Sequence, residues 1–165
     1  RPRQGPRPPI AVGGGGPKML ALAAKHADII SVAPGTTPDG KMKLSDMTIE
    51  RTAARVDRIR EVAGDRFADI ELNWTIAVIV ITDDREATAE VALKALAQGY
   101  PPNIAHDTEF TVDDVLTSPY IAIGSFEEIA DQIREVRRRT TMSYVCVFPT
   151  QMDAFAPVLA QLKGE

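Results

Sequence analysis

Cysteine and histidine are scarce in this chain of 165 residues, which contains one cysteine and two histidines. A single cysteine excludes an intrachain disulfide framework, and so few sulfur and imidazole ligands argue against a zinc site. Cys146 lies in the apolar run 144–148, so we expect a buried, unreactive thiol. His26 falls at the end of a predicted helix and His106 in a loop-rich segment. We therefore find no nucleophile–base–acid constellation in the sequence.

Long apolar runs and an excess of positive charge are also absent from the sequence. The mean hydropathy is −0.11, and no apolar run is long enough for a membrane span. A formal net charge of −4 argues against a general nucleic-acid binder. With 44% hydrophobic residues, the chain is long enough for one domain with its own core, spanning residues 1–165. We therefore expect a cytoplasmic protein without membrane or nucleic-acid partners.

A run of four consecutive glycines is the most informative feature that is present, at positions Gly13, Gly14, Gly15 and Gly16. The run follows a predicted apolar strand and precedes a helix that begins at Pro17. A folded chain keeps glycine where φ must be positive or where a ligand must approach the backbone closely. The free N–H groups of the helix would then bind an anion, which predicts a phosphate-binding loop. A tight turn without ligand is the alternative, because the run matches neither G-x-G-x-x-G nor the P-loop pattern.

Apolar strands alternate with helical patterns along the chain, which predicts a parallel α/β fold of four β/α units. Asp83-x-x-Glu86 and Ser125-x-x-Glu128 are capping patterns, and Gly64 supplies a left-handed stop for the helix before it. Residues 100–124 are expected to form an insertion segment before the last β/α unit. The predicted strands cover residues 9–13, 28–33, 70–81 and 143–148, and the predicted helices residues 17–26, 48–63, 84–98, 111–116, 125–139 and 152–162.

The strand predicted over residues 70–81 alternates in its first half, which places Glu71, Asn73 and Thr75 on one face. We expect Glu71 and Asn73 to be buried polar groups of a barrel interior, a structural role that outweighs catalysis.

Four β/α units amount to half of a closed (β/α)8 barrel, which typically needs about 250 residues. An open doubly wound sheet is the rival architecture. In that fold an acidic residue normally follows the nucleotide loop by about twenty positions, but Lys41 and Lys43 occupy that zone here.

Residues 8–29, which contain the glycine run, resemble the signature of the luciferase-like monooxygenase superfamily. More narrowly, they resemble oxidoreductases that use coenzyme F420, an 8-hydroxy-5-deazaflavin. The resemblance covers nearly the whole chain, because further matching segments follow in the same order at residues 63–67, 70–73, 82–84, 116–119, 143–148 and 156–158.

The resemblance implies an α/β fold that forms the C-terminal half of a (β/α)8 TIM barrel, with strands five to eight present and strands one to four missing. It implies hydride transfer between the cofactor and a small organic substrate, with coenzyme F420 as cofactor and FMN as the alternative. Ser31, at the end of the next strand, is a weaker cofactor-binding candidate, for which a plain core or turn role is equally acceptable. The cofactor-phosphate loop carried over by the resemblance is Val12, Gly13, Gly14, Gly15 and Gly16.

Two interpretations of the chain stay open at this point. In the first, the chain is part of an oxidoreductase or monooxygenase whose catalytic residues lie in the absent N-terminal half, and which forms a homodimer when complete. In the second, it is an autonomous, non-catalytic half-barrel that binds a phosphorylated ligand or a partner subunit. We favour the first, because residues 1–9 resemble a loop that enters a fifth strand. We also expect Gly14→Val and Gly15→Val to weaken cofactor binding far more than stability.

Overall fold

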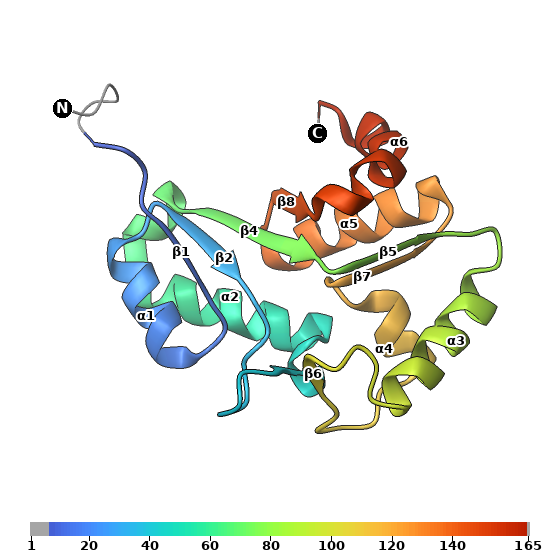
Figure 1. The fold of residues 1–165 in the computed structure, drawn as a ribbon. Coiled ribbons are helices and arrows are strands. Elements are labelled where there is room, and N and C mark those ends of the chain that lie inside the picture. The colour runs from blue at the N-terminus through green and yellow to red at the C-terminus, as the bar shows by residue number, and fades with distance from the viewer. Residues whose placement is uncertain (1–6, 165) are drawn as a thin grey trace.

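The computed structural model describes residues 7–164 and is built around a four-stranded parallel sheet (Figure 1). The order of the strands in the sheet is also their order in the chain, which confirms the predicted parallel α/β fold. Residues 1–6, most of the expected entry loop, lie outside the described part of the chain. The strands of this sheet are β1 (Ala11–Gly14), β2 (Ile29–Val32), β4 (Glu71–Ile76) and β8 (Tyr144–Val147).

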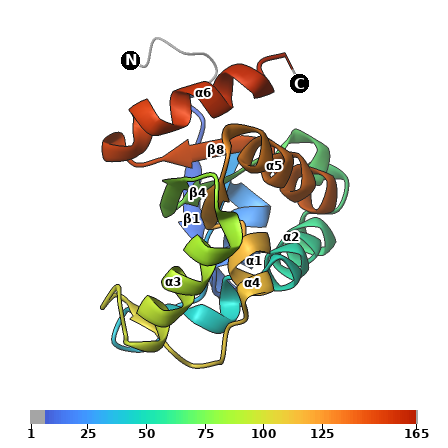
Figure 2. The ribbon, with the colours of Figure 1, turned by 90° about the vertical axis from the view of Figure 1, so that its right-hand side faces the viewer.

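Helices cover one face of this sheet, and they follow each other around it. α1 packs against α2, α2 against α5, and α5 against α6 (Figure 2). None of the helices within residues 7–164 combines the length and hydropathy that a membrane span requires. The α-helices are α1 (Pro17–His26), α2 (Ile49–Ala63), α3 (Arg85–Ala97), α4 (Val112–Thr117), α5 (Phe126–Thr140) and α6 (Met152–Leu162).

The two faces of the sheet differ in burial. Ile30 and Trp74 belong to the helix-covered face and are almost fully buried. The register pairs Ser31 with Asn73 and Thr75 with Cys146 on the opposite face. Those four side chains are only partly buried, so the expectation of a buried Cys146 thiol is wrong. Glu71, at the beginning of this face, is exposed and is not the buried interior group that we expected.

The strand predicted over residues 70–81 is two strands, because the chain changes its pairing partner at Ala77. β4 pairs with β2 and β8, whereas β5 (Val78–Ile81) pairs in parallel with β7 (Ile121–Gly124). At the change, the N–H groups of Ala77 and Val78 both donate to the Tyr120 carbonyl, at 2.8 and 3.3 Å.

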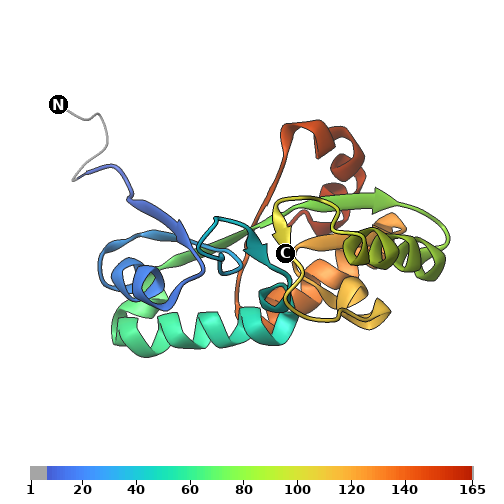
Figure 3. The same cartoon turned by 60° about the horizontal axis from the view of Figure 1, so that its bottom comes forward.

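Residues 100–124 contain three elements: the short helix predicted there, which is α4, and the two strands β6 (Ile104–Ala105) and β7, which were not predicted. β6 pairs in parallel with β3 (Met42–Lys43), so the segment after β2 and the segment after α3 lie side by side (Figure 3). Asp107 strengthens this contact, since its carboxylate accepts hydrogen bonds from the backbone N–H and the hydroxyl of Ser45, at 2.9 and 2.7 Å. Burial by itself would raise the pKa of Asp107, but the two hydrogen bonds from Ser45 together outweigh it and hold the pKa below its usual value.

Local capping explains most helix ends. Ser125 and Glu128 form the predicted capping box of α5. The cap of α3 is Asp84 and not Asp83, because the Asp84 carboxylate accepts the hydrogen bond from the Ala87 N–H at 3.1 Å. Gly64 ends α2 at the predicted position with a φ of +57°, but its ψ of −133° differs from the left-handed helical conformation that we expected. Short 3-10 helices complete the fold: η1 (Leu44–Asp46), η2 (Gly64–Asp69) and η3 (Pro149–Gln151).

Candidate functional site

A cleft of about 500 Å³ opens where β1 and β2 end. Its first wall is the glycine run with the beginning of α1, and its second wall is the segment that follows β2, extended by β3 and η1. Because the carboxyl ends of parallel strands carry the ligand sites of α/β folds, this is the expected edge of the sheet. The residues that line the cleft are Gly13, Gly14, Gly15, Gly16, Pro17, Met19, Ala33, Pro34, Gly35, Thr36, Lys43 and Asp46.

None of the four glycines of the run is among the positive-φ glycines of the described chain, which are Gly40, Gly64, Gly99, Gly124 and Gly164. Close packing, rather than a positive φ, explains why glycine is required at position 15. A Cβ on Gly15 would lie 2.2 Å from the Ala33 carbonyl oxygen and 2.4 Å from that of Pro34. The expectation that Gly15→Val would affect binding far more than stability is therefore wrong, because the added side chain would collide with the backbone of the second wall.

The other glycines of the run have different surroundings. A Cβ on Gly14 would lie 2.6 Å from Cγ of Met19, whereas a Cβ on Gly16 would have no atom within 4 Å. Gly16 therefore occupies the open position of the run. Val12 does not line the cleft, because it is on the helix-covered side of β1 and packs against the core.

The N-terminus of α1 faces this cleft and is set up for an anion. Gly16 is the N-cap without a side-chain hydrogen bond, and Pro17 is the first helical residue. The first turn of α1 contains no acidic residue. The other α-helices of the described chain all have one in their first turn, including Glu50 in α2 and Glu127 in α5. The partial positive charge of this helix end is thus not neutralised by a carboxylate in that turn, which favours an anionic ligand.

Two residues of the site, Asp46 and Arg55, were not anticipated. Arg55 is only 8% exposed, on the buried side of α2 between Thr52 and Val56. Its guanidinium forms an ion pair with the Asp46 carboxylate at 2.7 Å. The detectable signal was a charged residue on the apolar stripe of a predicted helix, since arginine is rarely buried without a partner.

A second, smaller cavity of about 120 Å³ adjoins the cleft and shares Ala33 and Pro34 with it. Ser31 lines this cavity rather than the cleft itself, together with Thr75 of β4 and Phe148 after β8. Tyr120 also lines this cavity, and burial raises the pKa of its phenol. Its hydroxyl donates to the Val32 carbonyl at 3.4 Å. The cleft and this cavity together extend across the carboxyl ends of all four strands of the main sheet.

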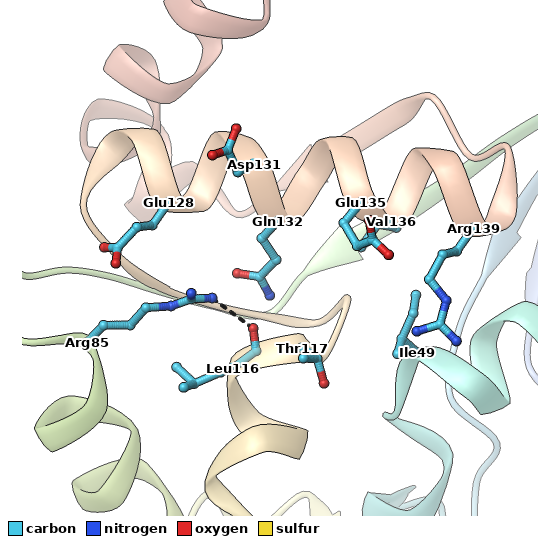
Figure 4. A pocket seen from close by; sticks show the side chains of 10 residues that line it. All are labelled: Ile49, Arg85, Leu116, Thr117, Glu128, Asp131, Gln132, Glu135, Val136 and Arg139. Atoms are coloured by element: carbon cyan, nitrogen blue, oxygen red, sulfur yellow. Dashed lines mark hydrogen bonds between the residues drawn. The ribbon is translucent and has the colours of Figure 1, made fainter.

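A cavity of about 300 Å³ lies elsewhere, between α5, α4 and the beginning of α2 (Figure 4). Two of its polar side chains, Arg85 and Gln132, donate hydrogen bonds to backbone carbonyls, while the buried Oε1 of Gln132 has no hydrogen-bond partner among the described residues. Arg85 donates to the carbonyls of Leu116 and Ile123, both at 3.0 Å. Gln132 donates to the carbonyls of Ser118 and Ile121, at 2.8 and 2.7 Å. The contacts of Arg85 fasten the end of α4 and β7 onto α3, and those of Gln132 fasten the connection between α4 and β7 onto α5, so we assign this cavity a structural role.

A metal centre finds no support in the described chain. Within residues 7–164, no three His, Cys, Asp or Glu side chains are grouped so that they could hold a metal ion. His26 lies in the last turn of α1, as expected.

The chain is similar in fold to larger enzymes of known structure. It matches a riboflavin lyase, solved with modified FMN and riboflavin, at 21% identity and a TM-score of 0.59 over 94% of this chain and 43% of the lyase. It matches the coenzyme F420-dependent tetrahydromethanopterin reductase of Methanopyrus kandleri at 14% identity and a TM-score of 0.57, over 91% of this chain and 48% of the reductase. A long-chain alkane monooxygenase matches at 17% identity, with a TM-score of 0.57 over 94% and 41% of the two chains.

At these identities the similarities show the fold, and the chain spans less than half the length of each of these enzymes. No curated protein matches the sequence. Residues 1–143 match the family described as luciferase-like monooxygenase, which is most of the chain. The chain belongs to the luciferase-like monooxygenase family.

Proposed function

We propose that this chain is the C-terminal half of a (β/α)8 barrel oxidoreductase or monooxygenase that uses coenzyme F420 or FMN. The open parallel sheet supports this, since its four strands follow one another in chain order with helices on one face only. So does the coverage of 43% and 48% of two solved relatives. In this arrangement β1, β2, β4 and β8 would be strands five to eight, with residues 100–124 inserted before the last unit.

The single observation that carries the function is the α1 N-terminus, free of first-turn carboxylates, at the end of the cleft. We assign it to the phosphate that FMN and coenzyme F420 both carry. Gly16 and the first turn of α1 would hold the phosphate, and Gly13, Gly14 and Gly15 would form the floor beside it.

The adjoining cavity would receive the part of the cofactor that leads toward the ring, past Ser31 and Thr75. When bound, the cofactor supplies the hydride chemistry, and the small organic substrate would lie against its ring. The residues of this chain bind and orient the cofactor and exclude water. We place the catalytic residues in the N-terminal half.

The N-terminal half of the barrel is also the partner that would cover the exposed apolar side chains of this chain. One group borders β1, namely Ile10, Met19 and Leu22, at 44%, 44% and 53% exposed. The other borders β8 and α6 at the opposite edge of the sheet and consists of Tyr144, Phe148, Met152 and Leu159. A closed barrel would cover both edges, which are otherwise free to pair with other strands.

Titration of the complete polypeptide that contains this chain tests the proposal. The ligands are FMN and riboflavin, and in parallel coenzyme F420 and its deazaflavin chromophore without the phosphate-bearing side chain. We expect one pair to bind, with the phosphate-bearing member at least tenfold tighter. The absorbance of the bound cofactor identifies which pair the protein uses. Equal affinity for both members of each pair would contradict the phosphate assignment.

A further inference from the structure

Arg55 contacts both walls of the cleft from one buried position on α2. Its Nε donates to the Gly15 carbonyl at 3.3 Å, which belongs to the first wall. Its Nη1 donates to the Asp46 carbonyl at 2.9 Å, and its Nη2 pairs with Oδ2 of Asp46 at 2.7 Å. The three contacts use all three guanidinium nitrogens.

Asp46 extends this contact to the second wall. Its Oδ2 also accepts a hydrogen bond from the Gly35 N–H at 3.1 Å. The fit is tight, since a Cβ on Gly35 would lie 2.3 Å from the same oxygen. The path from Gly15 through Arg55 and Asp46 to Gly35 therefore joins the two walls at a fixed spacing.

Holding the Gly15 carbonyl also fixes the peptide unit that contains the Gly16 N–H. In a trans peptide the C=O and the N–H of one unit point in opposite directions. Because the Gly15 carbonyl is directed to Arg55, the Gly16 N–H is directed away from it, at the open N-cap position of α1. Arg55 thus orients a donor at the place where we put the phosphate.

A buried ion pair is weak evidence for stability, because desolvation of both charges offsets their attraction. The geometry of the ion pair between Arg55 and Asp46 is more informative than its energy. A planar guanidinium can serve three acceptors at once, whereas a lysine ammonium cannot reproduce that fork. The main contribution of Arg55 is therefore to fix the conformation of the cleft.

We propose that Arg55, acting through Gly15 and Asp46, is a positioning residue that sets the phosphate-binding conformation of the cleft and so selects phosphate-bearing ligands. This inference rests on the proposed function of the same cleft. Arg55 does not touch the ligand, since its guanidinium is engaged on the far side of the Gly15 peptide.

The test compares Arg55→Met, Arg55→Lys and Asp46→Asn with the unmodified complete polypeptide. The probes are FMN and riboflavin, or the corresponding deazaflavin pair if that pair binds. The readout is the ratio of the two dissociation constants within the pair. We expect each variant to lower this ratio about tenfold, through weaker binding of the phosphate-bearing member, with the affinity for the other member unchanged. Arg58→Met is the matched control, because Arg58 is on the exposed side of α2, paired with Glu61.

The possible results distinguish a failure of the proposed phosphate site from a failure of the role proposed for Arg55. If the unmodified protein does not favour the phosphate-bearing ligand, the proposed phosphate site is wrong and this inference falls with it. If the unmodified protein discriminates and the variants keep the same ratio, Arg55 is not a positioning residue. An equal loss for both ligands would overturn the inference in favour of a purely structural role. Should Arg55→Met fail to fold, Asp46→Asn carries the comparison, because it removes the charge and retains the side-chain volume.

Discussion

Asp28 shows how one side chain fastens the beginnings of neighbouring strands. Its carboxylate accepts hydrogen bonds from the Ile10 N–H at 2.7 Å and from the Arg7 guanidinium at 2.9 Å. The Arg7 hydrogen bond first, and then that of Ile10, lower the pKa of Asp28 to about 2. The ionised carboxylate therefore holds the chain before β1 against the beginning of β2.

The lowered pKa of Asp28 predicts a pH dependence. The pKa in the folded protein is below the value near 3.9 of an unfolded chain, so the contribution to stability is complete above about pH 5. It is lost as the pH falls through the folded pKa of about 2. We expect Asp28→Asn to be less stable than the unmodified protein at pH 6, with the difference shrinking toward pH 2. Urea unfolding at several pH values measures this, and a difference independent of pH would contradict it.

The glycine run gives a second prediction at the residue scale, because neighbouring positions have opposite surroundings. Gly15→Ala would place a Cβ 2.2 Å from the Ala33 carbonyl oxygen, and we expect a loss of roughly 1–3 kcal/mol in the free energy of unfolding. Gly16→Ala meets no atom within 4 Å and changes only the cap, so we expect less than about 1 kcal/mol. Denaturant unfolding of the pair is the measurement. Equal losses would show that Gly15 is not required by close packing.

Arg55 and Gly15 also show which properties of single residues could not be predicted from the sequence. From the sequence, the glycine run was predicted to be a phosphate-binding loop, and the structure places the run in the lining of a cleft. The sequence did not contain the reason for Gly15, which is the approach of Ala33 and Pro34 from the next β/α unit. Likewise, the Arg55 side chain was visible on an apolar stripe, but its partner Asp46 lies at the end of η1, whose position depends on tertiary packing.

Helices were more predictable than strands at the element scale, because their ends are determined locally. α1 begins at Pro17, as predicted from the proline, and α5 begins directly after Ser125, as predicted from its capping box. The break at Ala77 could not be predicted in this way, since it depends on pairing with β7. The two-residue strands β3 and β6 exist only through their mutual pairing, so neither carries a pattern of its own.

The two ends of α1 provide a matched test of the anion site. Lys18 lies in the first turn of the helix and Lys25 in the last, and both are exposed. We expect Lys18→Glu to weaken binding of the phosphate-bearing cofactor about tenfold, because it adds a carboxylate where the helix dipole favours an anion. Lys25→Glu makes the same change in charge at the far end and should leave the affinity within about twofold. Equal effects of the two variants would indicate long-range charge rather than a local site.

The main sheet of the whole molecule has two edge strands, β1 and β8, each bordered by exposed apolar residues. We expect the 165-residue chain in isolation to self-associate, because unpaired strand edges and apolar patches favour association. Size-exclusion chromatography with light scattering at tens of micromolar measures this. Addition of the N-terminal half should convert the assemblies into a defined complex. A stable monomer that ignores the added half would contradict the half-barrel.

Turnover measured with and without the N-terminal half decides whether this chain is one half of an oxidoreductase. In the function that we propose, the cleft of this chain anchors the phosphate, but hydride transfer needs the reacting carbons held close together in a dry site. Oxidation of reduced coenzyme is followed spectroscopically with a panel of small organic acceptors. We expect no turnover by this chain alone, and turnover once the N-terminal half is supplied in the same polypeptide or as a separate one. Robust turnover by the isolated chain, at a rate that the added half does not change, would contradict the account.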